Sequence, residues 1–147
     1  MEPIGDERAD FRTWALFLRV HAQLVKRMDT ALRATAGIPI TWYDALFQID
    51  LAPGHRMRLQ DLESAVFLSQ SGVSRLAGRL EQEGLLVRSV AGADRRGVEV
   101  SLTPAGVRAL RRARAVQMRL IREAFADRLS DAQIRALRDA LQSLDGS

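Results

Sequence analysis

The chain has 147 residues, 47% of them hydrophobic, which suits one domain with a buried core. It contains no cysteine, which excludes disulfides and thiolate metal sites, and no apolar run approaches the roughly 18 residues of a membrane span. The acidic start of the chain, MEPIGDERAD, lacks the pattern of a signal peptide, so we expect a cytoplasmic location.

Basic residues outnumber acidic ones, and the excess is confined to the middle of the chain. The full sequence carries 22 basic and 18 acidic residues, a net charge of +4. Residues 51–114 alone hold eleven basic and six acidic residues. Positive charge concentrated around residues 69–106 favours a polyanionic partner such as nucleic acid. A solvated basic surface is the alternative.

The first predicted element is a long helix over residues 6–36. Its apolar residues, from Phe11 to Leu32, recur at a nearly heptad spacing, and further apolar positions widen that face. Such a helix is expected to contact more than one neighbour. Gly37 can cap its end, and the proline that follows cannot continue it.

Two shorter helices are predicted next. Thr41 with Asp44 resembles a capping box, with aspartate in the glutamate position, and is expected to open the first of them. Residues 53–54, a Pro-Gly pair, stop it. After a short basic turn, the apolar pattern from Leu59 indicates a further helix of about eight residues that packs on its predecessor.

A fourth helix and a hairpin complete the central part. Ser69 is expected to cap the fourth helix, and the very short connection before it forces a steep angle, as in a helix-turn-helix. Residues 85–90 and 98–102 alternate or cluster as short strands. The loop between them, AGADRRG, carries paired arginines and glycines, so the two strands are predicted to form a hairpin.

The fourth helix has one apolar face and one polar, basic face. Val73, Leu76 and Leu80 recur at the spacing that buries one face. The opposite face holds Gln70, Ser71, Ser74, Arg75, Gly78 and Arg79. Glycine inside a helix costs roughly 1 kcal/mol, so Gly72 and Gly78 suggest close approach to a rigid partner. Alternatively, Gly72 merely occupies the first turn, where the cost is small.

Two helices are predicted at the C-terminal end. Thr103 followed by Pro104 is an N-cap with proline in the first turn, and it starts a helix that runs to about Arg128. Ser130 with Gln133 forms a capping box that opens the last helix. The chain is therefore predicted to be mainly α, with a small β hairpin.

The central motifs resemble the MarR family of winged helix-turn-helix transcriptional regulators. LSQSGVSRLAGRLEQEGLL is followed by DRRGVEVSLTPAG, which holds the Asp-x-Arg of the wing and the Leu-Thr-x-x-Gly that enters the next helix. The resemblance implies a DNA-binding lobe over residues 41–102. It also implies dimerisation helices over residues 6–36 and 103–145, and hence a homodimeric, cytoplasmic repressor that binds a pseudo-palindromic operator.

The polar face of the fourth helix is the expected reader of DNA bases. One helix fits the major groove and reads base edges with side chains of its exposed face. The candidates are Ser69, Gln70, Ser71, Ser74, Arg75 and Arg79. Arg75 is expected to read a base, because arginine binds guanine in bidentate fashion. Arg79 either binds a phosphate or pairs with Glu83.

The hairpin loop is the expected wing contact. Arg95 and Arg96 are suited to the minor groove, and the resemblance points to Arg96. Asp94 would repel phosphate, so we expect it to support the loop or a guanidinium. Arg88, at the base of the hairpin, either faces a phosphate or is solvent-exposed.

Two residues depart from the usual helix-turn-helix pattern. Glu63 stands where a small alanine is common, and Phe67 stands where glycine is common in the turn. We expect Phe67 to pack inward as part of an enlarged core. The alternative is an altered angle between the third and fourth helices.

The resemblance also implies a small aromatic or phenolic ligand that shifts the spacing of the two DNA-binding lobes. Its candidate contacts are Trp14, Phe17, His21, Trp42, Tyr43 and Phe47. Core and interface packing is the alternative role for all six. No cofactor is expected.

Other functions are weaker alternatives. An enzyme is not expected, because His21 and His55 lie in different segments and no metal, phosphate-loop or nucleophile motif is present. An architectural DNA-binding protein without a sensor role, and a helical protein-interaction module, remain open. An affinity that depends on salt concentration would favour the DNA-binding hypotheses over the protein-partner hypothesis.

Overall fold

The computed structural model describes residues 4–67, 72–90 and 97–146, with side chains from residue 8 onward. It contains a small antiparallel sheet among helices, which confirms the predicted fold class. The elements are α1 (Ile4–Ala36), α2 (Ile40–Leu51), the 3-10 turn η1 (Pro53–His55), β1 (Arg56–Arg58), α3 (Leu59–Ala65), α4 (Val73–Gln82), β2 (Leu86–Val90), β3 (Val98–Leu102), α5 (Pro104–Ala124), the 3-10 turn η2 (Ala126–Arg128) and α6 (Asp131–Asp145).

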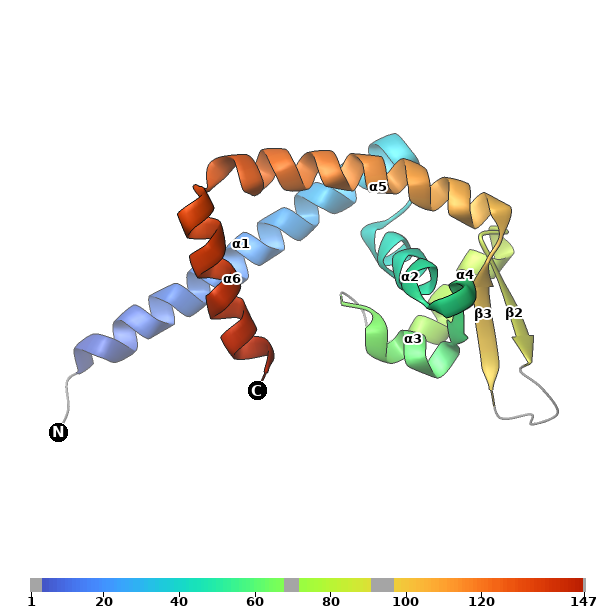
Figure 1. The fold of residues 1–147 in the computed structure, drawn as a ribbon, viewed down its shortest axis with the longest axis horizontal. Coiled ribbons are helices and arrows are strands. Elements are labelled where there is room, and N and C mark those ends of the chain that lie inside the picture. The colour runs from blue at the N-terminus through green and yellow to red at the C-terminus, as the bar shows by residue number, and fades with distance from the viewer. Residues whose placement is uncertain (1–3, 68–71, 91–96, 147) are drawn as a thin grey trace.

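The elements separate into a lobe and a set of long helices (Figure 1). Helices α2, α3 and α4 and the sheet lie together beneath one end of α5, and the β2 and β3 strands project from this group. Helix α1 packs along α5 and then continues past it, away from the lobe. Helix α6 follows the other end of α5 and runs at a steep angle to it. Both chain termini lie far from the β2 and β3 strands.

The core of the lobe is built around α2. Half of its twelve residues are buried, and they pack in one core cluster with buried leucines and valines from α1, α3, α4, β2, β3 and α5. Leu62 of α3, Leu80 of α4 and Leu86 of β2 are each fully or almost fully removed from solvent. Burying such side chains is the main favourable term in folding. The core therefore fixes α4 against α2 and the sheet.

The sheet has three strands rather than the two predicted. Its order is β1-β3-β2, with both pairs antiparallel, and Met57 of β1 lies opposite Val100 of β3. Residues 56–58 were expected to form only a basic turn, and that prediction was wrong. A three-residue strand has too few positions to show an alternating pattern, and its pairing depends on residues that lie about forty positions further along the chain.

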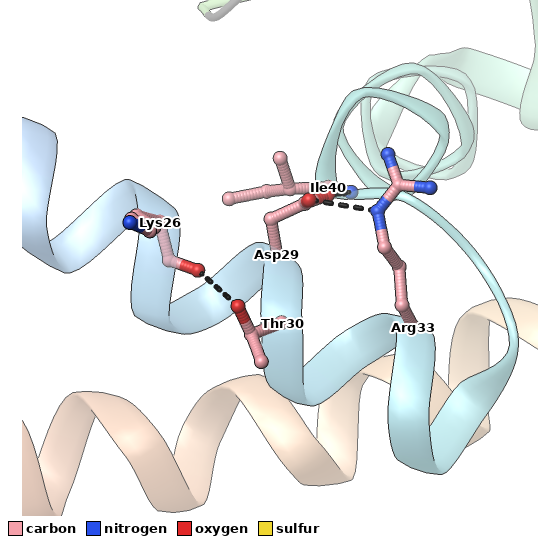
Figure 2. A network of polar contacts seen from close by, with 5 residues as sticks. All are labelled: Lys26, Asp29, Thr30, Arg33 and Ile40. Atoms are coloured by element: carbon pink, nitrogen blue, oxygen red, sulfur yellow. Dashed lines mark hydrogen bonds and ion pairs between the residues drawn. The ribbon is translucent and has the colours of Figure 1, made fainter.

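Helix α2 does not begin with the capping box predicted at Thr41 and Asp44. It begins at Ile40, its N-cap position is Pro39, and no side chain of that position caps it. Instead, the N–H of Ile40 donates to Oδ1 of Asp29 on α1 over 2.9 Å. Figure 2 shows this carboxylate between the two helices. The cap of α2 is therefore supplied by a residue of α1. Asp44 is buried in the lobe and does not take part in a capping box.

Asp29 also binds its own helix. Its Oδ2 accepts from Nε of Arg33 over 2.7 Å, and one turn away the hydroxyl of Thr30 donates to the carbonyl oxygen of Lys26 over 2.9 Å (Figure 2). The N–H of Ile40 lowers the pKa of the Asp29 carboxyl below its ordinary value, and Arg33 contributes in the same direction. Asp29 thus joins the end of α1 to the start of α2.

We expect the stability difference between the wild type and Asp29→Asn to shrink as the pH falls below about 4. A carboxyl group whose pKa is lowered by folding contributes stability above its ordinary pKa of 3.8 and loses it as the pH falls through the lower folded value. Urea unfolding of both proteins between about pH 6 and about pH 3 measures the difference. A difference that stays constant over this range would contradict the role given to Asp29.

Helix α4 begins later than predicted. Its first residue is Val73, and Gly72 is the N-cap with a φ of 81°, in the left-handed region. Gly72 therefore lies outside the helix, and the helical penalty that we assigned to it does not apply. Glycine fits this position because other residues rarely adopt a positive φ. Ser69, the predicted cap, lies outside the described residues.

The two C-terminal helix starts match the predictions. The Thr103 side chain accepts from the N–H of Gly106 over 3.0 Å, and Pro104 follows it at the first position of α5. Ser130 and Gln133 exchange both bonds of a capping box. Helix α5 ends at Ala124, before the predicted Arg128, and a 3-10 turn follows. Within the described part of the chain, no helix has the length and apolar character to cross a membrane.

Candidate nucleic-acid interface

The two faces of α4 are separated as the sequence predicted. Val73 and Leu80 are buried against α2 and the sheet, together with Ala77. Ser74, Arg75 and Arg79 are exposed on the other side. We call these three residues the reading face. The apolar face holds the helix in place, so the reading face is presented to solvent on a fixed support.

The two arginines of the reading face are not neutralised. Neither Arg75 nor Arg79 forms an ion pair with any residue that the structure describes. The pairing of Arg79 with Glu83 that the sequence allowed is therefore not formed. Two unpaired guanidinium groups next to a serine hydroxyl form a surface that can accept phosphate oxygens or the acceptor atoms of guanine.

Arg88 is exposed on β2, as one of the two alternatives predicted, and it also forms an ion pair with Glu81. Its Nη2 lies 3.2 Å from Oε1 of Glu81 on α4, and its main-chain N–H donates to Oε2 of the same carboxylate over 2.9 Å. These bonds from Arg88 lower the pKa of Glu81. Arg88 therefore joins β2 to the C-terminal half of α4 through its main-chain N–H and one guanidinium nitrogen. This role was missed because only the fold brings these two residues together.

Gly78 lies on α4, close to the guanidinium of Arg88. A Cβ atom at Gly78 would stand 3.9 Å from Nη2 of Arg88, which is an ordinary contact distance. The glycine leaves room for the arginine side chain to cross α4, and alanine would still fit. The described residues therefore do not require glycine here, and its close approach to an external partner stays a prediction.

The remaining predicted contacts cannot be located. Ser69, Gln70 and Ser71 precede α4, and Asp94, Arg95 and Arg96 form the loop between β2 and β3. All six lie outside the described residues. The hairpin strands that carry the loop are described, and Val90 lies directly opposite Val98 at the open end of the pair.

The excess of positive charge lies elsewhere than we expected. Between residues 56 and 102 the chain has seven basic and six acidic residues, which is close to neutral. The other basic residues counted within residues 51–114 are Arg108, Arg111, Arg112 and Arg114. All four lie on α5 rather than on α4 or the hairpin. The charge argument for the central stretch was therefore wrong, and the case for the interface depends on the reading face.

Phe67 does not pack inward. Its side chain is 80% exposed, which contradicts the predicted enlargement of the core. The chain leaves α3 at Val66, and that neighbour fills the available core position, because only 4% of its surface is exposed. The next side chain then points outward. The main-chain N–H of Phe67 donates to Oδ2 of Asp44 over 2.8 Å.

The six predicted ligand contacts do not form one cluster. Trp14 and Phe17 pair on α1 with ring centroids 6.1 Å apart, and both are exposed. Tyr43 stacks on Phe47 in α2 at 5.8 Å. Among the described residues, no ring contact joins these two pairs. His21 is exposed on α1 and Trp42 is half-buried on α2.

The α2 pair lies in a more enclosed environment than the α1 pair. Burial raises the pKa of Tyr43, although the positive charge of Arg114 acts in the opposite direction. The guanidinium of Arg114 lies 5.9 Å from the centre of the Phe47 ring, within the range of a cation–π contact. Arg114 is a residue that the sequence reasoning did not single out.

A pocket of about 440 Å³ lies between the end of α2, the end of β3 and the start of α5. Leu102, Val107 and Leu110 supply apolar walls, and Arg111 and Arg114 supply positive charge. None of the six predicted ligand contacts lines it. Its lining comes from two separate parts of the sequence, within residues 50–55 and 102–114, which only the fold brings together, so sequence patterns did not reveal it.

Comparison with known sequences identifies relatives of this chain. The sequence profile of the MarR family matches residues 36–97. A protein of Thauera aromatica, named as a transcriptional regulatory protein for the hcr operon, is 33% identical over 119 residues. That similarity covers 81% of this chain and 70% of the relative.

Solved structures share the whole fold. A MarR family transcriptional regulator of Streptomyces coelicolor, solved in complex with DNA, is 26% identical with a TM-score of 0.86, covering 99% of this chain and 89% of that one. AbsC, a MarR family regulator of the same organism, is 27% identical with a TM-score of 0.83, covering 100% and 99%. The family consists of regulators rather than enzymes. The chain belongs to the MarR family of winged helix-turn-helix, DNA-binding transcriptional regulators.

Proposed function

We propose that this protein is a ligand-responsive repressor that binds a pseudo-palindromic operator as a homodimer in the cytoplasm. The observation that carries the proposal is the reading face, where Arg75 and Arg79 are exposed, and form no ion pair with the described residues, on a helix held by its buried side. One such helix per chain reads one half-site, so a two-fold dimer reads a palindrome. Residues 41–102 form the reading lobe in this proposal.

The long helices supply the argument for a dimer. Large apolar side chains are exposed along the N-terminal half of α1, with Phe11 at 70%, and at the end of α6, with Leu144 at 68%. The N-terminal half of α1 extends away from the lobe, and α6 descends from the far end of α5 (Figure 1). An extended apolar surface of this kind on a regulator indicates a protein interface. We assign residues 6–36 and 103–145 to dimerisation, with a second copy of the chain as the partner.

We expect the wild type to sediment as a dimer at micromolar concentration, and Phe11→Glu to shift it toward the monomer, because a charge on a buried interface is costly. Val87→Glu is the matched control. Val87 is 50% exposed on β2 and lies outside the proposed dimer helices, so this variant should remain dimeric. A monomeric wild type, or equal dissociation of both variants, would contradict the proposed interface.

We assign each candidate side chain to a part of the operator from its residue type. Ser74 and Arg75, with Gln70 and Ser71, are assigned to the major groove, and Arg95 and Arg96 to the minor groove with Asp94 as their support. Arg79 and Ser69 are assigned to the DNA backbone. Arg88 contributes by holding the wing on α4. Selecting bound fragments from the source genome with the purified protein would reveal the operator and its neighbouring genes.

The ligand is proposed to be a small organic molecule with an aromatic ring and an acidic group. Trp14, Phe17, His21, Trp42, Tyr43 and Phe47 remain its candidate contacts, with the α1 and α2 groups to be brought together by the dimer. The positive charge of Arg114 beside Phe47 suits an acidic group. Such a ligand would regulate DNA binding by favouring one spacing of the two lobes over another.

A further inference from the structure

Among the Asp, Glu, Lys, Arg and His residues whose side chains the structure describes, Asp44 is the one that is buried, with 5% of its surface exposed. It lies on α2 between Tyr43 and Ala45, both of which are buried. A carboxyl group in these surroundings costs free energy unless hydrogen bonds compensate it. The N–H of Phe67 supplies one such bond, at 2.8 Å to Oδ2. A buried polar group with a long-range partner is a specific constraint on the fold.

The bond acts on the connection between α3 and α4. Helix α3 ends at Ala65, and the N–H of Val66 still bonds to the carbonyl oxygen of Leu62 over 3.1 Å. Phe67 is the next residue, and its exposed side chain cannot hold the chain in place by packing. The main-chain bond to Asp44 therefore ties residue 67 to the core.

The bond between Asp44 and the N–H of Phe67 joins two parts of the lobe that differ in how firmly they are held. On one side, α2 is the most buried helix of the lobe, and its first N–H is capped by Asp29. On the other side, α4 starts after Gly72 without a side-chain cap. The buried face of α4 holds this helix on the lobe, but its N-cap residue contributes no side-chain bond, so the preceding connection contributes to the position of its first turn.

We propose that Asp44 is a positioning residue for DNA reading. Through the N–H of Phe67 it sets where the α3–α4 connection begins, and thereby the orientation in which α4 presents Ser74 and Arg75. It acts through residue 67 and not through contact with DNA. This role rests on the DNA-binding function proposed above and adds to it a residue outside the reading helix.

Three variants test this role: Asp44→Ala, Asp44→Asn and Asp29→Ala. The probe is a duplex selected from genomic fragments by the wild type, and the readouts are its affinity by fluorescence anisotropy, the folded fraction by circular dichroism, and the exchange rate of the Phe67 amide by NMR. Asp29→Ala is the matched control, because it removes a similar carboxylate-to-backbone bond, 2.9 Å long, at the start of α2.

We expect Asp44→Ala to bind the duplex at least about tenfold more weakly than the wild type at equal folded fraction, with faster exchange of the Phe67 amide. Asp44→Asn retains an oxygen acceptor, so it should recover part of the affinity and part of the protection of the amide. Asp29→Ala should unfold at a lower temperature, yet bind like the wild type where it is folded.

Equal losses of affinity in Asp44→Ala and Asp29→Ala at equal folded fraction would overturn the proposal, because the effect would then be general destabilisation. If Asp44→Ala does not fold, Asp44→Asn decides alone, and an affinity equal to that of the wild type overturns the role. A wild type that binds no duplex would instead contradict the proposed DNA-binding function. The two failures are therefore distinguishable.

Discussion

Replacing Gly106 by alanine is expected to destabilise the protein by at least about 3 kcal/mol, because the added methyl group would collide with backbone. A Cβ atom at Gly106 would overlap the carbonyl oxygen of Leu85 and stand 3.0 Å from its carbonyl carbon. That oxygen already accepts the N–H of Thr103 over 3.1 Å, so it cannot move without weakening a second bond. Gly106 is where α5 passes closest to the turn before β2.

This junction links the reading lobe to α5. The hydroxyl of Thr103 donates to the carbonyl oxygen of Gly84 and accepts from the N–H of Gly106, so one side chain binds both sides of the contact. The turn after α4 and the first turn of α5 therefore form one hydrogen-bonded unit. A residue larger than glycine would force the two apart.

Urea unfolding of Gly106→Ala and Gly78→Ala measures the effect against a matched control. Gly78 lies inside α4, and a methyl group there would meet only the end of the Arg88 side chain at 3.9 Å. Alanine at Gly78 should be neutral or stabilising by up to about 1 kcal/mol, because it favours helix. Similar stability of the two variants would show that the close approach at Gly106 does not constrain the fold.

Arg75→Ala and Arg96→Ala are expected to change DNA binding in different ways. Loss of a bidentate base contact at Arg75 should reduce discrimination between operator and random duplex by about 1–3 kcal/mol, or roughly five- to 150-fold. Loss of a minor-groove arginine at Arg96 should weaken both duplexes alike. Arg75 is exposed and forms no ion pair with the described residues, so truncating it leaves no buried partner unsatisfied.

Competition binding with both duplexes at one salt concentration separates the two effects, because phosphate contacts depend strongly on salt. Arg108→Ala removes the same charge from the exposed side of α5, outside the reading lobe, and should leave discrimination unchanged. The division of roles fails if Arg75→Ala and Arg96→Ala lose equal affinity for operator and random DNA.

The parts of the fold that were predicted correctly depend on local patterns. The caps at Thr103 and Ser130 each involve a bond to a residue three positions away, so short motifs were sufficient to identify them. The buried and exposed faces of α4 likewise follow from its helical spacing. The exposure of Ser74, Arg75 and Arg79 could therefore be predicted without any knowledge of tertiary contacts.

The predictions that failed depend on tertiary contacts that short sequence motifs do not show. Thr41 has the sequence of a cap, but the N–H of Ile40 is satisfied by Asp29, eleven residues earlier. Asp44 was assigned to the same box, although it binds a residue 23 positions later. Phe67 was expected inside because of its apolar character, yet Val66 already fills the core. In each case a tertiary contact overrides a local preference.

The most direct test of the account is the affinity and stoichiometry of the wild type on a genomic duplex that it selects, compared with the same duplex carrying scrambled half-sites. A homodimeric, sequence-specific regulator should bind the selected duplex at least about a thousandfold more tightly, with two chains per duplex. Equal affinity for both duplexes, or one chain per duplex at saturation, would contradict the account.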